Sequence, residues 1–253
     1  MAPAFDIVAS SFERQRLLPT GVPEAIRSAI LAAVHVPPPA RVLDIGAGTG
    51  RIGRAFITAG DSYVGVDTSL AMLREFQASS GFGFLIQADG GQLPFHRGVF
   101  DIVLFTHVLS GIRDWQALLT EARRILQPGG IVAVGHTQSP ESGIEGQLKR
   151  CLRSMLEEMG VQWQPQESRR EALAWLESSA ARHAHARAAS WKVSTSIREF
   201  LLRHRSGARF AALPGAIQEQ ALQKLSAWAE KTLGPLDAGF DEERRFELDL
   251  FEF

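Results

Sequence analysis

The sequence predicts an α/β fold built on a parallel sheet, and two neighbouring segments support this prediction. An apolar strand at 41–45 runs into the glycine-rich turn 46–50, and a helix is expected directly after it, at about 50–59. A second apolar run, 63–67, then ends in an acid. Strand, turn, helix and strand in this order form a βαβ unit, whose two strands lie parallel.

The glycine-rich turn 46–50 is suited to hold a ligand. Gly46, Gly48 and Gly50 permit positive φ and allow a ligand to approach more closely than a Cβ would. The helix after the turn directs its free N–H groups and about half a positive charge toward the same place. We therefore expect a cofactor at this turn.

Asp44 helps to decide which cofactor binds there. Residues 48–53 satisfy G-x-G-x-x-G, a weak indication of dinucleotide binding when taken alone, and a nucleotide-dependent oxidoreductase is one alternative. A carboxylate two residues before the first glycine would repel a pyrophosphate, whereas it attracts an ammonium or a sulfonium. S-adenosylmethionine carries both of these cations, so we favour it as the cofactor.

With Val-Leu before it, the D-x-G-x-G sequence at 44–48 resembles that of the class I S-adenosylmethionine-dependent methyltransferases. Asp89 followed by Leu-Pro-Phe at 93–95, and Leu-x-Pro-Gly-Gly at 126–130, resemble their type 11 branch, which is like the enzymes of ubiquinone and menaquinone biosynthesis. The resemblance implies a Rossmann-like, seven-stranded, mostly parallel sheet with an antiparallel last strand and helices on both faces. It covers 41–134 motif by motif and the remainder by topology.

Two further acids are predicted to bind the cofactor. Asp67 lies 21 positions after Gly46, where a parallel neighbouring strand brings its carboxylate to the ribose hydroxyls. A helix N-cap at Asp67 or Thr68 is the alternative. The resemblance implies that Asp89 bonds the adenine amino group, although the local pattern alone makes it a turn residue. The complete predicted set is Asp44, Gly46, Ala47, Gly48, Gly50, Asp67, Thr68, Ala88, Asp89, Gly90 and Thr106, with no metal site.

The methyl acceptor is expected at the exit of the strand 100–105, since open α/β sheets bind ligands at their carboxyl ends. The following Thr106-His107 offers neither the Pro-Pro-aromatic sequence nor the cysteine that nucleic-acid methylation uses. Methyl transfer mainly requires orientation and desolvation. If the acceptor is a hydroxyl, His107 is the first candidate for a base and His136 the second, with a structural role as the alternative for each.

Composition sets the broad class of the protein. The 253 residues are 45% hydrophobic with a formal charge of −1, which predicts one domain without a field that attracts polyanions. Cys151 is the single cysteine, so an internal disulfide and a multi-cysteine zinc site are excluded, and a buried, inert thiol is expected. Neither a leader nor an apolar run of membrane-spanning length is evident, and we expect a cytoplasmic protein.

A small-molecule acceptor is favoured over nucleic acid. Two alternatives remain open: a protein that binds S-adenosylmethionine without catalysis, and a methyltransferase that acts on RNA or protein.

The single domain 1–253 divides into cap helices at 1–40, a cofactor-binding core at 41–136 and a C-terminal part at 137–253 with a helical insert at 196–245. Further helices are expected from apolar periodicity at 5–16, 22–34, 69–77, 115–126, 145–159, 169–180, 196–203 and 214–233. Further strands are expected at 82–88, 131–134, 186–193 and 246–253.

Two groups outside the core are candidates for the acceptor site. Phe5 and Phe12 either line a pocket or make packing contacts, of which packing is favoured. A basic cluster in the insert either binds an anionic substrate or forms a solvated helix face. The solvated face is the favoured interpretation. The cluster consists of Arg198, Arg203, His204, Arg205 and Arg209.

Overall fold

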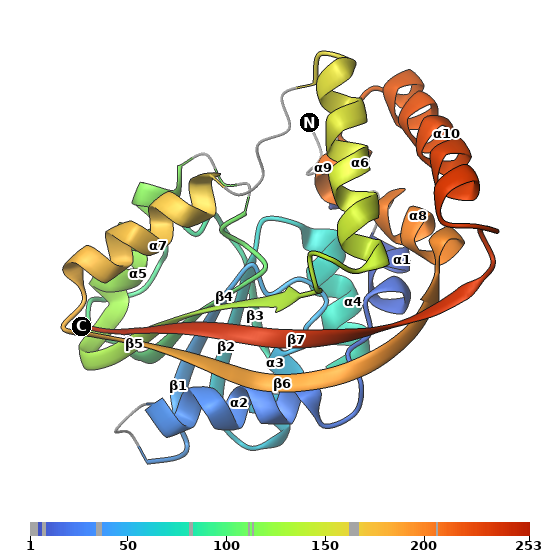
Figure 1. Cartoon of the computed structure of the whole chain (residues 1–253). Helices are drawn as coiled ribbons and strands as arrows, with labels where there is room; N and C mark the ends of the chain where they lie inside the picture. The colour runs from blue at the N-terminus through green and yellow to red at the C-terminus, as the bar shows by residue number, and fades with distance from the viewer. Residues whose placement is uncertain are drawn as a thin grey trace.

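A seven-stranded sheet forms the centre of the computed structural model, which describes residues 5–6, 9–33, 37–80, 83–110, 112, 114–161, 167–205 and 207–253 (Figure 1). The strand order is β3-β2-β1-β4-β5-β7-β6. β7 runs antiparallel to both of its neighbours, and the pairs from β3 to β5 are parallel. The strands are β1 (Arg41–Ile45), β2 (Ser62–Asp67), β3 (Phe84–Gln87), β4 (Phe100–Thr106), β5 (Leu126–Gln138), β6 (Arg182–Ser196) and β7 (Gly239–Glu252). The predicted fold class is confirmed.

The sheet reverses its strand order between β1 and β4. All but the first residue of β1 and all but the last of β4 are buried, as expected for parallel strands covered on both faces. Asp44 pairs in register with Gly65 of β2 and with Leu104 of β4, so the carboxyl ends of the three strands meet. A crevice opens outside the carboxyl ends at such a reversal.

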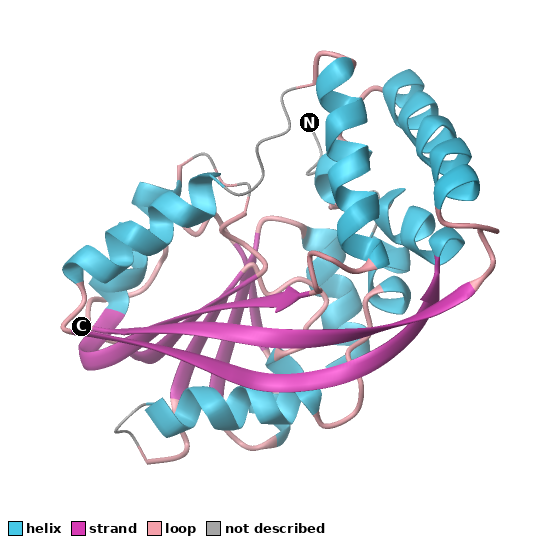
Figure 2. Cartoon of the chain, viewed as in Figure 1, coloured by secondary structure: helices cyan, strands magenta, loops and turns pink. Residues whose placement is uncertain are grey.

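Helices cover both faces of the sheet, as Figure 2 shows. α5 and α7 pack on one face through an apolar cluster that includes Leu119 and Leu176, whereas α2 and α3 pack on the other through Ile30 and Phe56. The helices are α1 (Ala9–Gln15), α2 (Val22–Ala33), α3 (Gly53–Thr58), α4 (Leu70–Ser80), α5 (Trp115–Ile125), α6 (Ile144–Glu158), α7 (Glu167–Ser179), α8 (Ile197–Arg205), α9 (Ala208–Ala211) and α10 (Gly215–Thr232). The helix expected from Gly50 begins only at Gly53 and spans six residues, so the turn before it contributes more to any ligand site than the helix does.

The insert has its own apolar core. Leu152 of α6, Phe200 of α8 and Leu225 of α10 are buried together, and the half-buried Cys151 packs against them. Burial raises the pKa of the Cys151 thiol, which favours its protonated, less reactive form. The residue is only half-buried, whereas a buried one was expected. Figure 1 shows this helical group beyond the carboxyl ends of the parallel strands, across from α5 and α7.

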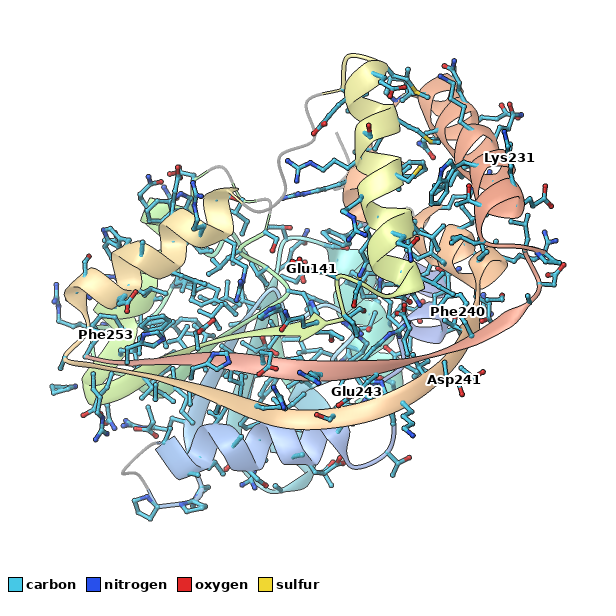
Figure 3. All side chains as sticks on the ribbon, viewed as in Figure 1. Glu141, Lys231, Phe240, Asp241, Glu243 and Phe253 are labelled. Carbon is cyan, nitrogen blue, oxygen red and sulfur yellow. The ribbon has the colours of Figure 1, made fainter. Side chains whose placement is uncertain are left out.

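The last two strands are longer than the sequence predicts. β6 and β7 pair from Arg182 with Glu252 to Ser196 with Gly239, so the insert between them spans 197–238 rather than 196–245. The start of β7 lacks apolar alternation, and only pairing with β6 makes it a strand. In Figure 3, Phe240 and Phe253 mark the opposite ends of this region, one near α10 and the other near α7. The two strands therefore connect the insert to the sheet.

Candidate active site

Asp44 lies fully buried at the carboxyl end of β1. The hydroxyl of Tyr63, on the neighbouring β2, donates a hydrogen bond to its Oδ2 at 2.8 Å. Its Oδ1 is buried and, among the described residues, has no hydrogen-bond partner. Burial raises the pKa of Asp44 to about 7, although the Tyr63 hydrogen bond opposes the shift and the Asp67 charge adds to it. A buried carboxylate oxygen of this kind is suited to a ligand cation.

The glycine-rich turn is stabilised by hydrogen bonds to the end of the neighbouring strand β2. The N–H groups of Gly46 and Ala47 donate to the carbonyl of Val66, at 2.8 and 3.0 Å, and the N–H of Gly48 donates to Asp67 Oδ2 at 2.9 Å. All three glycines have positive φ, as predicted. Only Gly48 faces open space, because a Cβ at Gly46 would meet Val108 and one at Gly50 would meet the Phe76 ring. A ligand can therefore approach the backbone closely at Gly48.

Asp67 ends β2 beside this turn. Its Oδ1 accepts a hydrogen bond from Ser69 N at 2.9 Å, so both of its carboxylate oxygens are held by backbone N–H groups. Ser69 caps α4 instead, since its Oγ accepts from Met72 N at 3.2 Å. The N-cap considered at Asp67 or Thr68 is therefore wrong by one or two residues. Burial raises the pKa of Asp67, and the N–H groups of Ser69, Gly48 and Thr68 oppose that shift.

The segment after β3 joins the same edge of the sheet. Ala88 N donates to the carbonyl of Asp67 at 3.2 Å, and a Cβ on Gly90 would meet Ile45 and Leu118. Asp89 is exposed, and its Oδ1 accepts from Gly91 N at 2.9 Å, the geometry of an Asx turn. The predicted cofactor residues from three separate strands thus lie at one edge, with Thr106 at the end of the adjacent β4.

His107 follows β4 in an unusual conformation. It is the one non-glycine residue with positive φ, at 59°, in the described part of the chain, and its N–H donates to the carbonyl of Gly135. Its Nε2 lies 3.3 Å from Thr137 Oγ1, and its ring meets Phe246 edge to face. The residue is exposed to solvent, although charged groups from several elements act on its ring. A strained residue at a strand end is typical of functional sites.

The surroundings of His107 are cationic. Burial, with smaller contributions from the positive charges of Arg51, His136, Arg16 and Arg169, lowers its pKa to about 3. The ring is therefore neutral at physiological pH and far less basic than expected. His136 is half-buried, with Nδ1 3.1 Å from Arg169 Nη2, and burial lowers its pKa as well. Each imidazole is therefore a weak base in this protein.

Phe12 links the N-terminal helix to the glycine-rich turn. It packs against the buried pair Ala9 and Met72, and the guanidinium groups of Arg16 and Arg51 lie 4.4 and 5.4 Å from the centre of its ring. The favoured packing role of Phe12 is confirmed. Phe5 contacts the Phe12 ring edge to face, with 6.0 Å between ring centroids, and is itself 40% exposed.

The basic cluster of the insert does not form a single face. Arg198 is exposed and paired with Asp237, and Arg205 is exposed, as the solvated interpretation requires. Arg203 instead pairs with the buried Glu145, and His204 stacks on Phe200 with 4.0 Å between ring centroids. The solvated interpretation is therefore wrong for these two residues, because the apolar core of the insert draws them inward.

Arg209 also turns inward. Its guanidinium is half-buried and donates to the carbonyl of Ser110, three residues beyond His107. This contact joins α9 of the insert to the segment that leaves β4. It places a further cation at the edge of the same region.

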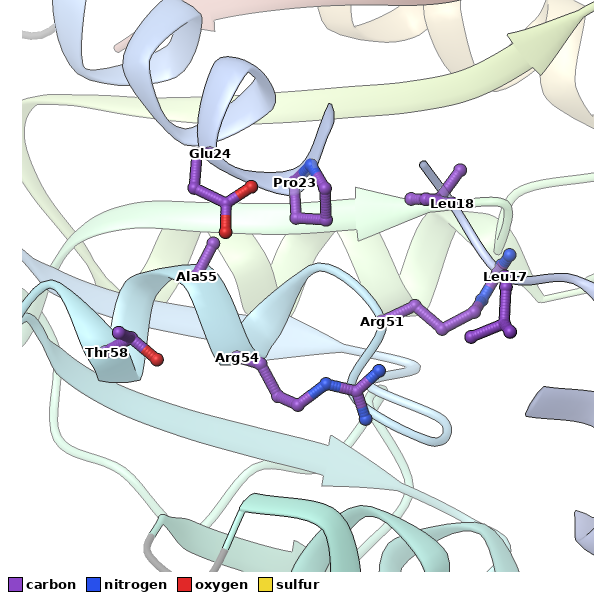
Figure 4. Close-up of a pocket in the computed structure, with 8 residues that line it drawn as sticks. All are labelled: Leu17, Leu18, Pro23, Glu24, Arg51, Arg54, Ala55 and Thr58. Carbon is purple, nitrogen blue, oxygen red and sulfur yellow. The ribbon is translucent and has the colours of Figure 1, made fainter. Parts of the chain in front are cut away.

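Arg51 is also one of the residues that line a small cavity of about 130 Å³ between α2 and α3, shown in Figure 4. This volume is below the roughly 300 Å³ of common ligand sites. The cavity is lined by Leu17, Leu18, Pro23, Glu24, Arg51, Arg54, Ala55 and Thr58. Asp44, Asp67 and His107 are not among the lining residues. The cavity is therefore separate from the edge at which the predicted cofactor residues meet.

Sequence reasoning missed Tyr63, Arg16 and Arg51. Tyr63 is the single tyrosine, and its position in an apolar strand hid its contact with Asp44. Arg51 directly follows the glycine-rich turn, a position that could have suggested a role. The sequence around Arg16 contains no pattern that suggests a role, because only the fold brings α1 beside the glycine-rich turn.

Comparison with known proteins shows similarity to methyltransferases. Residues 43–134 match the family model of the methyltransferase domain. A demethylmenaquinone methyltransferase of Streptomyces griseus is 32% identical over 141 residues, which cover 55% of this chain and 61% of that protein. A second, from a Parafrankia species, is 32% identical over 161 residues, or 63% of its length. The chain thus spans less than two thirds of either relative.

Solved structures show the same fold at low identity. YcgJ of Bacillus subtilis aligns with a TM-score of 0.58 at 18% identity, over 90% of this chain and 97% of that one. A Haemonchus contortus phosphoethanolamine N-methyltransferase, solved with phosphomonomethylethanolamine and S-adenosylhomocysteine, aligns with a TM-score of 0.55 at 16% identity, over 98% of this chain and 57% of that one. The fold is that of the class I methyltransferases.

Proposed function

We propose that the protein transfers a methyl group from S-adenosylmethionine to a small-molecule acceptor, because residues 43–134 match the family model of the methyltransferase domain. The observation that carries the proposal is the buried Oδ1 of Asp44, which has no hydrogen-bond partner among the described residues, beside the open backbone at Gly48. An ammonium or sulfonium cation would satisfy that oxygen, whereas a pyrophosphate would be repelled. The same observation counts against the nucleotide-dependent oxidoreductase.

The residues present fit this cofactor along its length. Asp44 and the turn at Gly48 would hold the amino-acid end. Asp67 would accept hydrogen bonds from the ribose hydroxyls, using the free lone pairs of its two oxygens. Asp89 would accept from the adenine amino group, with Ala88 and Gly90 against the ring. When bound, the cofactor supplies a methyl group activated by its sulfonium.

The chain's contribution to the reaction is orientation and exclusion of water. His107 is better suited to hold an acceptor by a hydrogen bond from its neutral ring than to remove a proton, because a base with a pKa near 3 holds protons weakly at pH 7. Thr137 fixes the direction of the ring through its hydroxyl. We therefore assign His107 a positioning role in place of the catalytic base expected from the sequence.

The acceptor class follows from charge and resemblance. The formal charge of −1 offers no extended field for a nucleic acid, which supports a small molecule. Two relatives are demethylmenaquinone methyltransferases, so a quinol of that kind is one candidate acceptor.

Among the described residues, none of the helices has the length and apolar character of a membrane span. We propose a cytoplasmic site of action.

Thermal unfolding with ligands tests the proposal. S-adenosylmethionine and S-adenosylhomocysteine should raise the melting temperature by mass action, by an amount that grows with ligand concentration, whereas NADH should leave it unchanged. Stabilisation by NADH alone would contradict the proposal. Release of S-adenosylhomocysteine with an extract of small molecules would separate an enzyme from the alternative, a protein that only binds the cofactor.

A further inference from the structure

Tyr63 of β2 is a buried residue whose hydroxyl is held against Asp44. The residue is 3% exposed, and its hydroxyl donates a hydrogen bond to Asp44 Oδ2 at 2.8 Å. The ring stacks against Phe56 of α3, with 6.4 Å between ring centroids, and meets Phe76 of α4 edge to face at 5.9 Å. Packing against two helices thus fixes the ring, and the ring in turn fixes the hydroxyl.

Gly53, the last glycine of the G-x-G-x-x-G sequence at 48–53, makes room for this hydroxyl. A Cβ at Gly53 would overlap the Tyr63 hydroxyl and come within 3.0 Å of the Phe76 ring. The φ angle of Gly53 lies outside the left-handed region, so the backbone itself does not require a glycine here. An internal contact with Tyr63 therefore explains the glycine that completes the dinucleotide pattern.

The two carboxylate oxygens of Asp44 have different surroundings. Oδ2 accepts the Tyr63 hydrogen bond, whereas Oδ1 is buried without a hydrogen-bond partner in the described part of the chain. Burial and the charge of Asp67 both disfavour the ionised form of Asp44, and the hydrogen bond from Tyr63 favours it. Burial and the Asp44 charge raise the pKa of Tyr63 well above its ordinary value, so its hydroxyl keeps its proton near neutral pH.

We propose, on the basis of the proposed function, that Tyr63 positions Asp44 for the cofactor: its hydroxyl occupies Oδ2 and leaves Oδ1 for the ammonium at the amino-acid end of S-adenosylmethionine. Tyr63 acts through Asp44, so it is a positioning residue and not a catalytic one. Without this hydrogen bond the buried acid would hold its proton more firmly and would attract a cation less. Tyr63 therefore favours a ligand that carries an ammonium over one that lacks it.

The pH dependence of binding in Tyr63→Phe tests the proposal. Phenylalanine keeps the ring and removes only the hydroxyl. Asp44 must be ionised to attract the ammonium, so calorimetric titration with S-adenosylhomocysteine should show that the pH at half-maximal affinity moves upward by about one pH unit. From a wild-type pKa of about 7, the affinity of the variant should be about ninefold lower at pH 6, about fivefold lower at pH 7 and less than about twofold lower at pH 8.5. The ligand's own ionisation is the same in both proteins and cancels.

Controls separate positioning from a role in folding. The affinity for 5′-methylthioadenosine, which lacks the amino-acid part, should be unchanged in Tyr63→Phe. In an Asp44→Asn background the same change should cost less than about twofold in affinity for S-adenosylhomocysteine, since no charge remains to be held. Thr195→Val is the matched control, because it removes another buried hydroxyl that donates to a carboxylate, that of Glu199 at 2.9 Å. It should leave both affinities and the pH profile unchanged.

A measurement on the unaltered chain does not depend on how well Tyr63→Phe folds. Tyr63 is the single tyrosine, so tyrosine labelled with carbon-13 at Cζ gives one NMR signal that reports this hydrogen bond. The signal should titrate near pH 7 without ligand and stay constant from pH 6 to pH 8.5 with S-adenosylhomocysteine bound, because the ammonium then keeps Asp44 ionised. The titration should be absent in Asp44→Asn.

Three results would overturn the proposal. The first is an unchanged affinity and pH profile in Tyr63→Phe. The second is an affinity loss by the same factor at every pH that 5′-methylthioadenosine shares, since Tyr63 would then act on the fold of the site. The third is an NMR signal that neither titrates nor responds to S-adenosylhomocysteine. If the wild-type protein binds neither S-adenosylmethionine nor S-adenosylhomocysteine, the proposed function itself fails, so the two failures are distinguishable.

Discussion

Asp44 shows at the scale of one residue how a binding site can lower stability. Its carboxylate is buried, receives one hydrogen bond and has a pKa near 7, far above that of an exposed aspartate. Between about pH 4 and pH 7 the folded protein keeps a proton that the unfolded chain has lost. Folding therefore becomes less favourable as the pH rises through this range. The resulting loss of free energy of unfolding is complete above pH 7.

Asp44→Asn should consequently stabilise the protein without ligand. Asparagine can still accept the Tyr63 hydrogen bond through its amide oxygen, yet it carries no buried charge. We expect a gain of roughly 2–4 kcal/mol in the free energy of unfolding at pH 8 and little gain at pH 4. The same variant should lose affinity for S-adenosylmethionine. Urea unfolding at both pH values and calorimetric titration check this, and a destabilised variant at pH 8 would contradict it.

The glycines of the turn provide a second comparison. Gly48 and Gly60 both have positive φ, at 56° and 85°, and a Cβ on either would meet no side chain within 4 Å. Gly48→Ala and Gly60→Ala should therefore lose a similar stability, about 1 kcal/mol each from backbone strain. Only Gly48→Ala should also weaken S-adenosylhomocysteine, because its methyl group points into the ligand space. Equal ligand affinity in the two variants would mean that the cofactor does not contact Gly48.

At the scale of elements, Glu145 connects the insert to the sheet. It lies buried at the start of α6 and pairs with Arg203 of α8 and Arg244 of β7, and Lys149 lies 3.6 Å away. Burial alone would raise its pKa, but Arg203, Arg244 and Lys149 outweigh that effect and lower the pKa to about 2. Three elements thus depend on one carboxylate.

Glu145→Gln should destabilise the protein by about 3–5 kcal/mol at pH 7, because two half-buried arginines lose their counter-charge. Because the folded pKa lies below that of the unfolded chain, the wild-type advantage is complete above about pH 4.5 and disappears as the pH falls toward 2. Glu157→Gln is the matched control on the same helix. Its exposed pair with Arg153 should contribute less than about 0.5 kcal/mol. Chemical denaturation at several pH values measures both, and equal losses would refute the special role of Glu145.

At the scale of the whole molecule, the predicted cofactor residues come from loops that are distant in sequence. Saturation with S-adenosylhomocysteine should slow amide hydrogen exchange together in 46–50, 67–69 and 88–91, since one ligand would cover all three. The outer ends of β6 and β7, 194–196 and 239–241, serve as the internal control and should not change. Protection of a single loop would show that the assigned residues do not form one site.

Much of the core was predictable, because its signals are local. The strand at 41–45, the turn after it and the acid that ends β2 stand close together in the chain, and parallel pairing then places Asp67 beside Gly48. The resemblance to the methyltransferases, confirmed by the family match, rests on these same short motifs. The roles of the cofactor residues remain predictions, although the structure brings their loops to one edge.

The sequence by itself determined the core strands and the glycine-rich turn and predicted the class of cofactor, since periodicity and glycine placement depend on neighbours a few residues apart. Only the tertiary structure decided the electrostatics: it buries Asp44 beside Tyr63, brings Arg16 beside Arg51, and lowers the pKa of His107. It also made the polar start of β7 a strand by pairing it with β6. Burial and long-range pairing depend on residues that are far apart in the chain, so no local pattern predicts them.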